Sequence, residues 1–217
     1  MPVFDIHTHI PGESPCESVL CIETDSGLAV PGGLYSAGIH PWSLNPDTFP
    51  DRLAVLKELM KSDSVVALGE CGLDPLRGPS LEFQREAFVS QALAAQESGK
   101  PMILHVVRQF DSLLSIGRQL HPSVKWLVHG FRGGVQQMQQ LLDNGLYLSF
   151  GPGARPQTLS AVPPYSLILE TDGKCAIAEV QTMAALARGC TVQEIRETSA
   201  RAAAGFLGLR PERGNPF

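Results

Sequence analysis

Two histidines and an aspartate alternate within the first nine residues, where residues 4–9 read FDIHTH. Alternate side chains of a β-strand point to the same face, so Asp5, His7 and His9 would all face one way. Two imidazoles on one face can bind a single metal ion, and Asp5 can orient one of them through its other ring nitrogen. The alternative is a surface strand with two solvated histidines, and this segment alone does not decide between the two.

Further histidines and carboxylates end the strands that the rest of the sequence predicts. They are His40, Glu70, His105, His129 and Asp172. Of the six histidines only His121 lies away from a predicted strand end. The carboxyl ends of the strands form the active-site face of a (β/α) barrel, so these side chains would share one rim. Each alone could be a structural hydrogen-bonding group, but together they predict an active site.

The number of candidate ligands indicates two metal ions rather than one. A catalytic zinc usually takes three protein ligands and keeps a position open, whereas this rim offers six. They are His7, His9, Glu70, His105, His129 and Asp172. Glu70 is the natural bridge, because its strand lies between the two sets in barrel order. Mixed imidazole and carboxylate ligands suit Zn, Mn, Co or Fe, and Mg less well. Two such ions promote hydrolysis by activating water, and Asp172 would accept or position the proton of that water.

The pattern of the whole chain must supply the elements that carry these residues. Short apolar segments alternate with longer helical patterns, which predicts βαβ units and a parallel sheet, and hence an α/β TIM-like barrel. The predicted strands are Val3–His9, Val19–Glu23, Tyr35–His40, Val65–Glu70, Met102–Val107, Lys125–Val128, Leu146–Phe150 and Ser166–Glu170. Six helices are expected to begin near Asp51, Ser80, Phe110, Val135, Ile177 and Thr191, the last with a capping box.

The connections between the first three strands are too short and too rich in glycine and proline for a good helix. Parallel strands normally need a crossover of about a dozen residues. The barrel is therefore predicted to be trimmed, with its first helices missing or reduced. The uncovered face of the first strands would be covered by loops and the C-terminal tail, or used for self-association.

Composition excludes several classes of protein. The 217 residues are 43% hydrophobic and 18% charged, which is typical of a globular protein. No apolar run is long enough to cross a membrane, and no signal peptide is apparent. Five scattered cysteines predict reduced thiols in a cytoplasmic protein. With a net charge of −5 there is no general basic surface, so a nucleic acid would be held locally or through metal ions. We expect one hydrolase domain over residues 1–209 and an irregular tail over 210–217.

The motifs FDIHTHI, GIHPW, GECGLD, PMILH, VHGFRGG and LETD occur in this order. As a set the series resembles the TatD-type DNase family of the amidohydrolase superfamily, from residue 3 to about residue 209. The resemblance implies a TIM-like barrel and metal-dependent hydrolysis of phosphodiester bonds in DNA. It assigns the first metal to His7, His9, Glu70 and Asp172, the second to Glu70, His105 and His129, and a position near the substrate phosphate to His40.

The chain departs from the family at positions that would face the substrate. The arginine of the fifth motif comes one residue late, at Arg108, while Gly130 and Arg132 stand where the family commonly has Cys and Ser. Gly173 and Lys174 replace an Ala-Pro pair. Arg108, Arg132 and Lys174 could each offset phosphate charge, or could form ordinary surface ion pairs. The resemblance therefore supports hydrolase chemistry more strongly than it supports DNA as the substrate.

The sequence favours a metal-dependent phosphodiesterase or deoxyribonuclease that acts on DNA or a small phosphoester and has no membrane partner. One alternative is a hydrolase of a small amide, lactone or phosphoester, because the same ions polarise a carbonyl. A non-catalytic metal-binding protein is disfavoured because every candidate ligand is present. Trp42, after the GIHP turn, could stack a base, although rim packing is the favoured interpretation.

Overall fold

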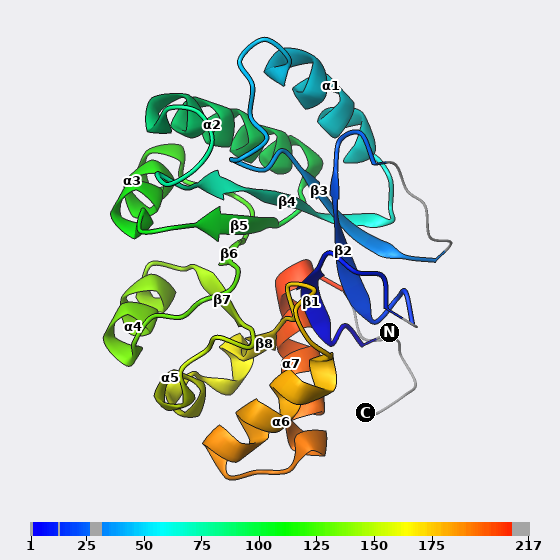
Figure 1. Ribbon diagram of the computed structural model, residues 1–217, viewed down its shortest axis with the longest axis vertical. Helices are drawn as coiled ribbons and strands as arrows, with labels where there is room; N and C mark the ends of the chain where they lie inside the picture. Colours follow the sequence, from blue (N-terminus) through cyan, green and yellow to red (C-terminus); the bar gives the residue numbers. More distant parts are fainter. Residues whose placement is uncertain (1, 13, 27–31, 210–217) are drawn as a thin grey trace. The chain divides into compact units, whose positions relative to one another are not determined.

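The computed structural model describes residues 2–12, 14–26 and 32–209, so the predicted tail 210–217 lies outside the described residues. These residues contain eight β-strands, seven α-helices and one 3₁₀ helix (Figure 1). The strands are β1 (Asp5–Thr8), β2 (Ser18–Glu23), β3 (Leu34–Gly38), β4 (Val65–Leu73), β5 (Met102–Val106), β6 (Trp126–Val128), β7 (Tyr147–Phe150) and β8 (Ile168–Leu169). The helices are α1 (Phe49–Leu59), α2 (Leu81–Ser98), α3 (Phe110–Leu120), α4 (Val135–Asp143), α5 (Pro156–Ala161), η1 (Pro164–Ser166), α6 (Ile177–Arg188) and α7 (Val192–Leu207).

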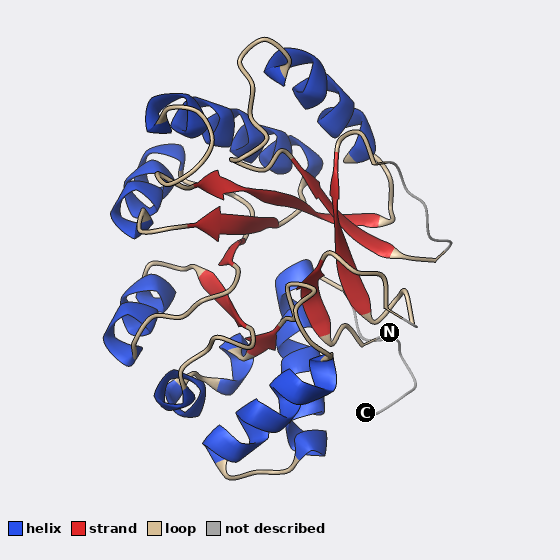
Figure 2. Cartoon of the chain, viewed as in Figure 1, coloured by secondary structure: helices blue, strands red, loops and turns tan. Residues whose placement is uncertain are grey.

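The strands follow one another in sequence order, from β1 to β8, in an eight-stranded sheet. Strand β1 pairs with β2, β3 with β4, β4 with β5, β5 with β6, and β7 with β8, all of them parallel. After β3, each strand is followed by a helix (Figure 2). This confirms the predicted (β/α)-barrel topology.

The first part of the barrel is reduced as expected. Strands β1, β2 and β3 follow one another with no helix between them among the described residues, and α1 is the first helix of the chain (Figure 1). The gaps at residue 13 and residues 27–31 lie in these two connections.

Two details of the helices differ from the sequence prediction. The sequence places the start of the first helix near Asp51, with Asp51 as its cap, whereas helix α1 begins at Phe49 and Thr48 takes the N-cap position, so the predicted cap was wrong. Pro50 is well suited to a first helical turn, and Asp51 then lies where a carboxylate interacts favourably with the helix dipole. Helix α5 was not predicted, because six residues are too few to show a helical period.

The chain divides into two compact units. The first comprises Met1–Leu20, Gly32–Leu34 and His129–Phe217, and the second comprises Cys21–Pro31 and Tyr35–Val128. The predicted site residues are distributed over both. Each unit is therefore described by itself.

In the first unit a buried carboxylate joins the N-terminal strand to the end of β8. The Thr171 backbone N–H and hydroxyl both donate to the Asp5 carboxylate, at 2.9 and 2.6 Å. The His7 N–H also donates to this carboxylate, at 3.4 Å. Burial raises the pKa of Asp5 to about 7, against the lowering effect of the bonds from Thr171. The result is a fixed register between His7 and the residues that follow β8.

In the second unit two buried glutamines of α2 hold the ends of β3 and β4. Gln91 accepts from the Ile39 N–H at 2.9 Å and donates to the Ile39 carbonyl at 3.2 Å. Gln84 accepts from the Asp74 N–H at 2.7 Å and donates to three carbonyls of the following loop. Because both side chains are fully enclosed, these bonds replace water as partners of the strand ends. They set the backbone positions of His40 and Asp74.

Candidate functional site

In the first unit, β1 and the residues after β8 bring His7, His9 and Asp172 together. The Nε2 atoms of His7 and His9 lie 3.7 and 3.4 Å from Oδ1 of Asp172. The three residues offer ligand atoms that all lie within 4.8 Å of one another. His7 is fully buried, whereas His9 is 48% exposed. The trio therefore combines a sequestered imidazole with one that solvent can reach.

Local backbone contacts hold Asp172 in this position. Its N–H donates to the His7 carbonyl at 3.0 Å, and its φ of 54° lies in the left-handed region that aspartate tolerates. Burial acts to raise the pKa of Asp172, but bonds from His9 and Lys174 and the nearby imidazoles hold that pKa well below its ordinary value. Asp172 is therefore a carboxylate, suited to binding a cation and orienting water, and a weak acceptor for a proton.

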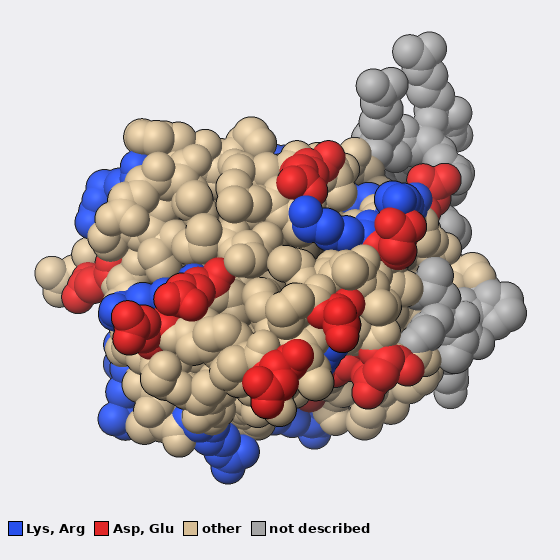
Figure 3. All heavy atoms as spheres, turned by 90° about the horizontal axis from the view of Figure 1, so that it is seen from above, with Lys and Arg blue, Asp and Glu red and all other residues tan. Residues whose placement is uncertain are grey.

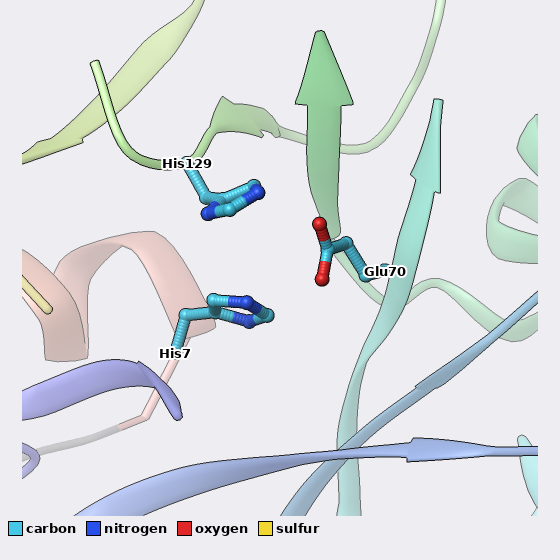
Figure 4. A group of neighbouring side chains, drawn as sticks. All are labelled: His7, Glu70 and His129. Carbon is cyan, nitrogen blue, oxygen red and sulfur yellow. The ribbon is translucent and has the colours of Figure 1, made fainter. Parts of the chain in front are cut away.

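His129 lies beside His7 in the same unit. Their ring centroids are 4.4 Å apart, and Figure 4 shows the two rings next to each other. Nδ1 of His129 lies 3.4 Å from Oε1 of Glu170, whose other oxygen accepts a bond from the Ser149 hydroxyl. Burial acts to raise the pKa of Glu170, but the charge and bond of His129 lower it. Glu170 thus orients the His129 ring as an ionised partner.

Sequence reasoning missed this role of Glu170. It named Glu170 only as part of the LETD motif at the end of the eighth strand. A signal was available, since Glu170 and Asp172 are two residues apart, and a carboxylate inside an apolar strand is rarely buried unless it is paired. Its partners, however, come from elsewhere in the fold.

In the second unit, the strand ends bring Glu70, His105 and His40 together. Oε1 of Glu70 lies 2.8 Å from Nδ1 of His105 and 3.3 Å from Nε2 of His40. The ligand atoms of this trio also lie within 4.8 Å of one another. Glu70 is buried, and its carboxylate extends from β4 in Figure 4.

The hydrogen bonding of the His40 ring distinguishes this residue from Glu70 and His105. The Trp42 N–H donates to Nδ1 of His40 at 3.1 Å, so this nitrogen carries no proton. A neutral imidazole then holds its proton on Nε2, the atom that faces Glu70. An N–H group donates a hydrogen bond and leaves no lone pair for a metal. The geometry favours His40 as a donor to the Glu70 carboxylate, and its predicted place near the substrate phosphate stays a prediction.

His105 is held between two carboxylates. Its Nε2 lies 3.2 Å from Oδ2 of Asp74, which also accepts from the Trp42 indole N–H at 2.6 Å. Burial acts to raise the pKa of Asp74, but the bonds from Leu76, Trp42 and His105 lower it. The two carboxylates thus hold the ring from both sides, with Nε2 of His105 facing Asp74 and Nδ1 facing Glu70. Asp74 therefore both holds its loop, by accepting from the Leu76 N–H, and orients a predicted metal ligand.

The three cationic residues predicted to contact the substrate differ in their position relative to the candidate ligands. Arg132 and Lys174 line a pocket together with Asp172, and the amine of Lys174 contacts the Asp172 carboxylate. The Arg132 guanidinium packs against Gly153, where an added Cβ would come within 2.5 Å of Nε. Arg108 is exposed just after β5, with a φ of 53°. Two of the three predicted cations thus adjoin a candidate ligand within one unit.

A model of the family described as TatD related DNase matches residues 19–203 of this chain. The chain belongs to this family. Among its relatives, the "3'-5' ssDNA/RNA exonuclease TatD" of Erwinia amylovora is 29% identical over 203 residues, which cover 80% of this chain and 78% of that protein. The protein named "Uncharacterized metal-dependent hydrolase YcfH" in Escherichia coli K12 is 31% identical over 119 residues, 54% of this chain and 44% of the relative.

Solved structures of TatD proteins share the fold. The structure of YJJV, a TATD homolog from Escherichia coli K12, superposes with a TM-score of 0.79 at 21% identity, covering 95% of this chain and 98% of that one. A hydrolase TatD family protein from Entamoeba histolytica gives 0.77 at 15% identity, covering 97% and 99%. At these identities the likeness establishes the fold.

The residues that depart from the TatD motifs at positions 132, 173 and 174 lie close to Asp172. Gly173 takes a φ of 67°, which bends the chain directly after Asp172, and Lys174 then reaches back to that carboxylate. Arg132 lines the same pocket. The substitutions in this chain therefore place two cations beside Asp172.

Proposed function

We propose that this protein is a metal-dependent phosphodiesterase that hydrolyses single-stranded nucleic acid. The observation that carries the proposal is the joining of His7, His9 and Asp172, from the two ends of the first unit, into one imidazole–carboxylate set. Membership of the TatD related DNase family and the names of its relatives support the reaction class.

The donor chemistry fits divalent cations. Two imidazoles with an ionised carboxylate suit Zn, Mn or Co. In this proposal His7, His9 and Asp172 hold one cation, and Glu70 with His105 contributes to a second. A bound cation of this kind lowers the pKa of water and polarises a phosphoryl oxygen. The bridging role of Glu70 and the assignment of His129 to the second cation stay predictions.

In this proposal the neighbouring side chains orient the water and bind the phosphate. Asp172 stays ionised and accepts a hydrogen bond from the attacking water, which fixes the direction of attack. His40 donates its Nε2 proton toward a phosphate oxygen. Arg132 and Lys174 offset phosphate charge on the Asp172 side, where both line one pocket.

A nucleic-acid substrate must be held locally. Acidic and basic side chains are interspersed on the face drawn in Figure 3, which fits the net charge of −5. Such a surface attracts a phosphate backbone only weakly, so a few cations and the metals supply the binding. All five cysteines are free, which supports the cytoplasmic location in this proposal. Within the described part of the chain, no helix has the length and apolar character needed to span a membrane.

Removal and return of the metal test the reaction. We expect chelator-treated protein to cleave neither a single-stranded oligonucleotide nor a chromogenic phosphodiester, and Mn, Co or Zn to restore both activities. Metal content by mass spectrometry is measured alongside, with activity rising in proportion to bound metal. Full activity in protein shown to be metal-free would refute the mechanism. Cleavage of the chromogenic ester alone would remove nucleic acid as the substrate.

Two variants on the Asp172 side test the role of Arg132. Arg132→Ala removes a charged partner of phosphate, and we expect kcat/KM on the oligonucleotide to fall roughly 10-fold. Gly153→Ala leaves the arginine in the sequence but forces its guanidinium to move, because the new Cβ would meet it. A similar loss in this second variant is expected, with an unchanged Tm. Normal rates in both would show that Arg132 does not contact substrate.

A further inference from the structure

We infer that Trp42 and Arg77 form a stacking subsite for one nucleobase beside the phosphate that is cleaved. This inference rests on the proposed function and names the part of the substrate that the second unit recognises. Trp42 is 45% exposed, which is unusual for a tryptophan because this side chain is on average largely buried. The Arg77 guanidinium lies over its ring, with Cζ 4.5 Å from the ring centroid.

The tryptophan is held rigidly although it is exposed. Its indole N–H donates to Asp74 at 2.6 Å, and its ring meets the rings of His40 and His105 edge-on, at centroid distances of 4.7 and 5.3 Å. An aromatic ring whose orientation is fixed in advance loses little entropy when a ligand stacks on it. Its contacts with His40 and His105 place it next to the groups that the proposed function assigns to the phosphate and the metal.

The loop that carries Arg77 is fixed against the same turn. Gly78 has a φ of 85°, and a Cβ at this position would lie 2.2 Å from the Pro41 carbonyl oxygen, so only glycine permits this approach. The buried Gln84 side chain donates to the Arg77 carbonyl at 2.9 Å. The backbone of the loop is therefore positioned, while the exposed Arg77 side chain can turn.

A nucleobase is the ligand that fits these two groups. Bases stack on aromatic side chains and on planar guanidinium groups, and they do so with little dependence on sequence. Arg77 can pair with the far face of a base that lies on Trp42, or give its place to that base and bind the adjacent phosphate. A substrate without a base offers no planar face that could stack on Trp42.

Two variants separate stacking from the support that Trp42 provides to Asp74. Trp42→Phe and Trp42→Leu both lack the indole N–H, but only phenylalanine keeps an aromatic face. Each is assayed on oligothymidylate and on an abasic oligomer of equal length, both single-stranded. We expect kcat/KM on oligothymidylate to be roughly 10-fold lower for the leucine than for the phenylalanine variant, and equal for both variants on the abasic oligomer. Equal values on both substrates would overturn the subsite.

A binding measurement decides the matter independently of catalysis. The chain has two tryptophans, and Trp126 is buried, so quenching by a bound base reports Trp42. We expect 5′-dAMP to quench the fluorescence of chelator-treated wild-type protein, and 2-deoxyribose 5-phosphate to have no effect. The quenching should disappear in Trp42→Phe. If it persists in that variant, the subsite is wrong. If the wild-type protein cleaves no phosphodiester but shows this quenching, the proposed reaction fails and the base subsite stands.

Discussion

Replacing Glu70 by glutamine will abolish hydrolysis and lower the amount of bound metal together. Glu70 is buried, and one of its oxygens approaches both His105 and His40. Glutamine keeps the shape but removes the negative charge that a divalent cation needs. Metal centres supply several kcal/mol of transition-state stabilisation, so we expect kcat/KM to fall on the order of 10³-fold or more.

The measurement combines the rate on a chromogenic phosphodiester with metal content after dialysis. Glu97→Gln is the matched control, because this exposed carboxylate of α2 pairs with Lys57 on the surface and lies in the same unit. We expect the control to retain its metal and its rate. A Glu70→Gln enzyme with wild-type metal content and rate would remove Glu70 from the site.

Asp172→Asn will weaken the binding of the cation that we assign to His7, His9 and Asp172. Several kcal/mol of transition-state stabilisation depends on a bound metal, so we expect kcat/KM to fall roughly 10²-fold or more. The pKa of Asp172 lies well below its ordinary value of 3.8 because His9, Lys174 and the neighbouring imidazoles outweigh burial. The ionised form is therefore the form that the fold stabilises. Asparagine cannot supply this charge.

The lowered pKa of Asp172 also predicts how the stability of the metal-free protein changes with pH. A lowered pKa contributes stability above pH 3.8, and this contribution is lost as the pH falls through the folded-state pKa. We expect wild type to be more stable than Asp172→Asn at neutral pH, with the difference shrinking in acid. Urea unfolding at several pH values measures this, and Asp143→Asn, an exposed change on α4, serves as the control. A constant difference down to strongly acidic pH would contradict the assignment.

Much of the fold and of the site could be predicted because it depends on local patterns. The alternation of strand and helix signals predicts the barrel topology, and the glycine- and proline-rich connections predict the missing first helices. His7 and His9 share a strand face by period alone. The motifs that place histidines and carboxylates at strand ends also indicated the family. Each motif spans only a few residues, so it can be read directly from the sequence.

The tertiary structure decided how these side chains are used. Two of the donors to the Asp5 carboxylate come from Thr171, 166 residues away, and no local pattern reports a bond between such distant groups. Likewise, Glu170 orients His129, 41 residues before it in the chain. The role of His40 follows from a backbone N–H two residues on, which depends on the exact turn after β3.

The sequence by itself therefore determined which chemical groups are present and along which strands they lie. Residue type and the spacing of apolar residues are local properties of the chain. Only the tertiary structure decided which groups the ring nitrogens of His40 and His105 face, which carboxylate stays ionised, and that the exposed Trp42 is held beside His40 and His105. These properties arise from hydrogen bonds and burial between segments far apart in the chain. Their energies exist only once the fold has brought those segments together.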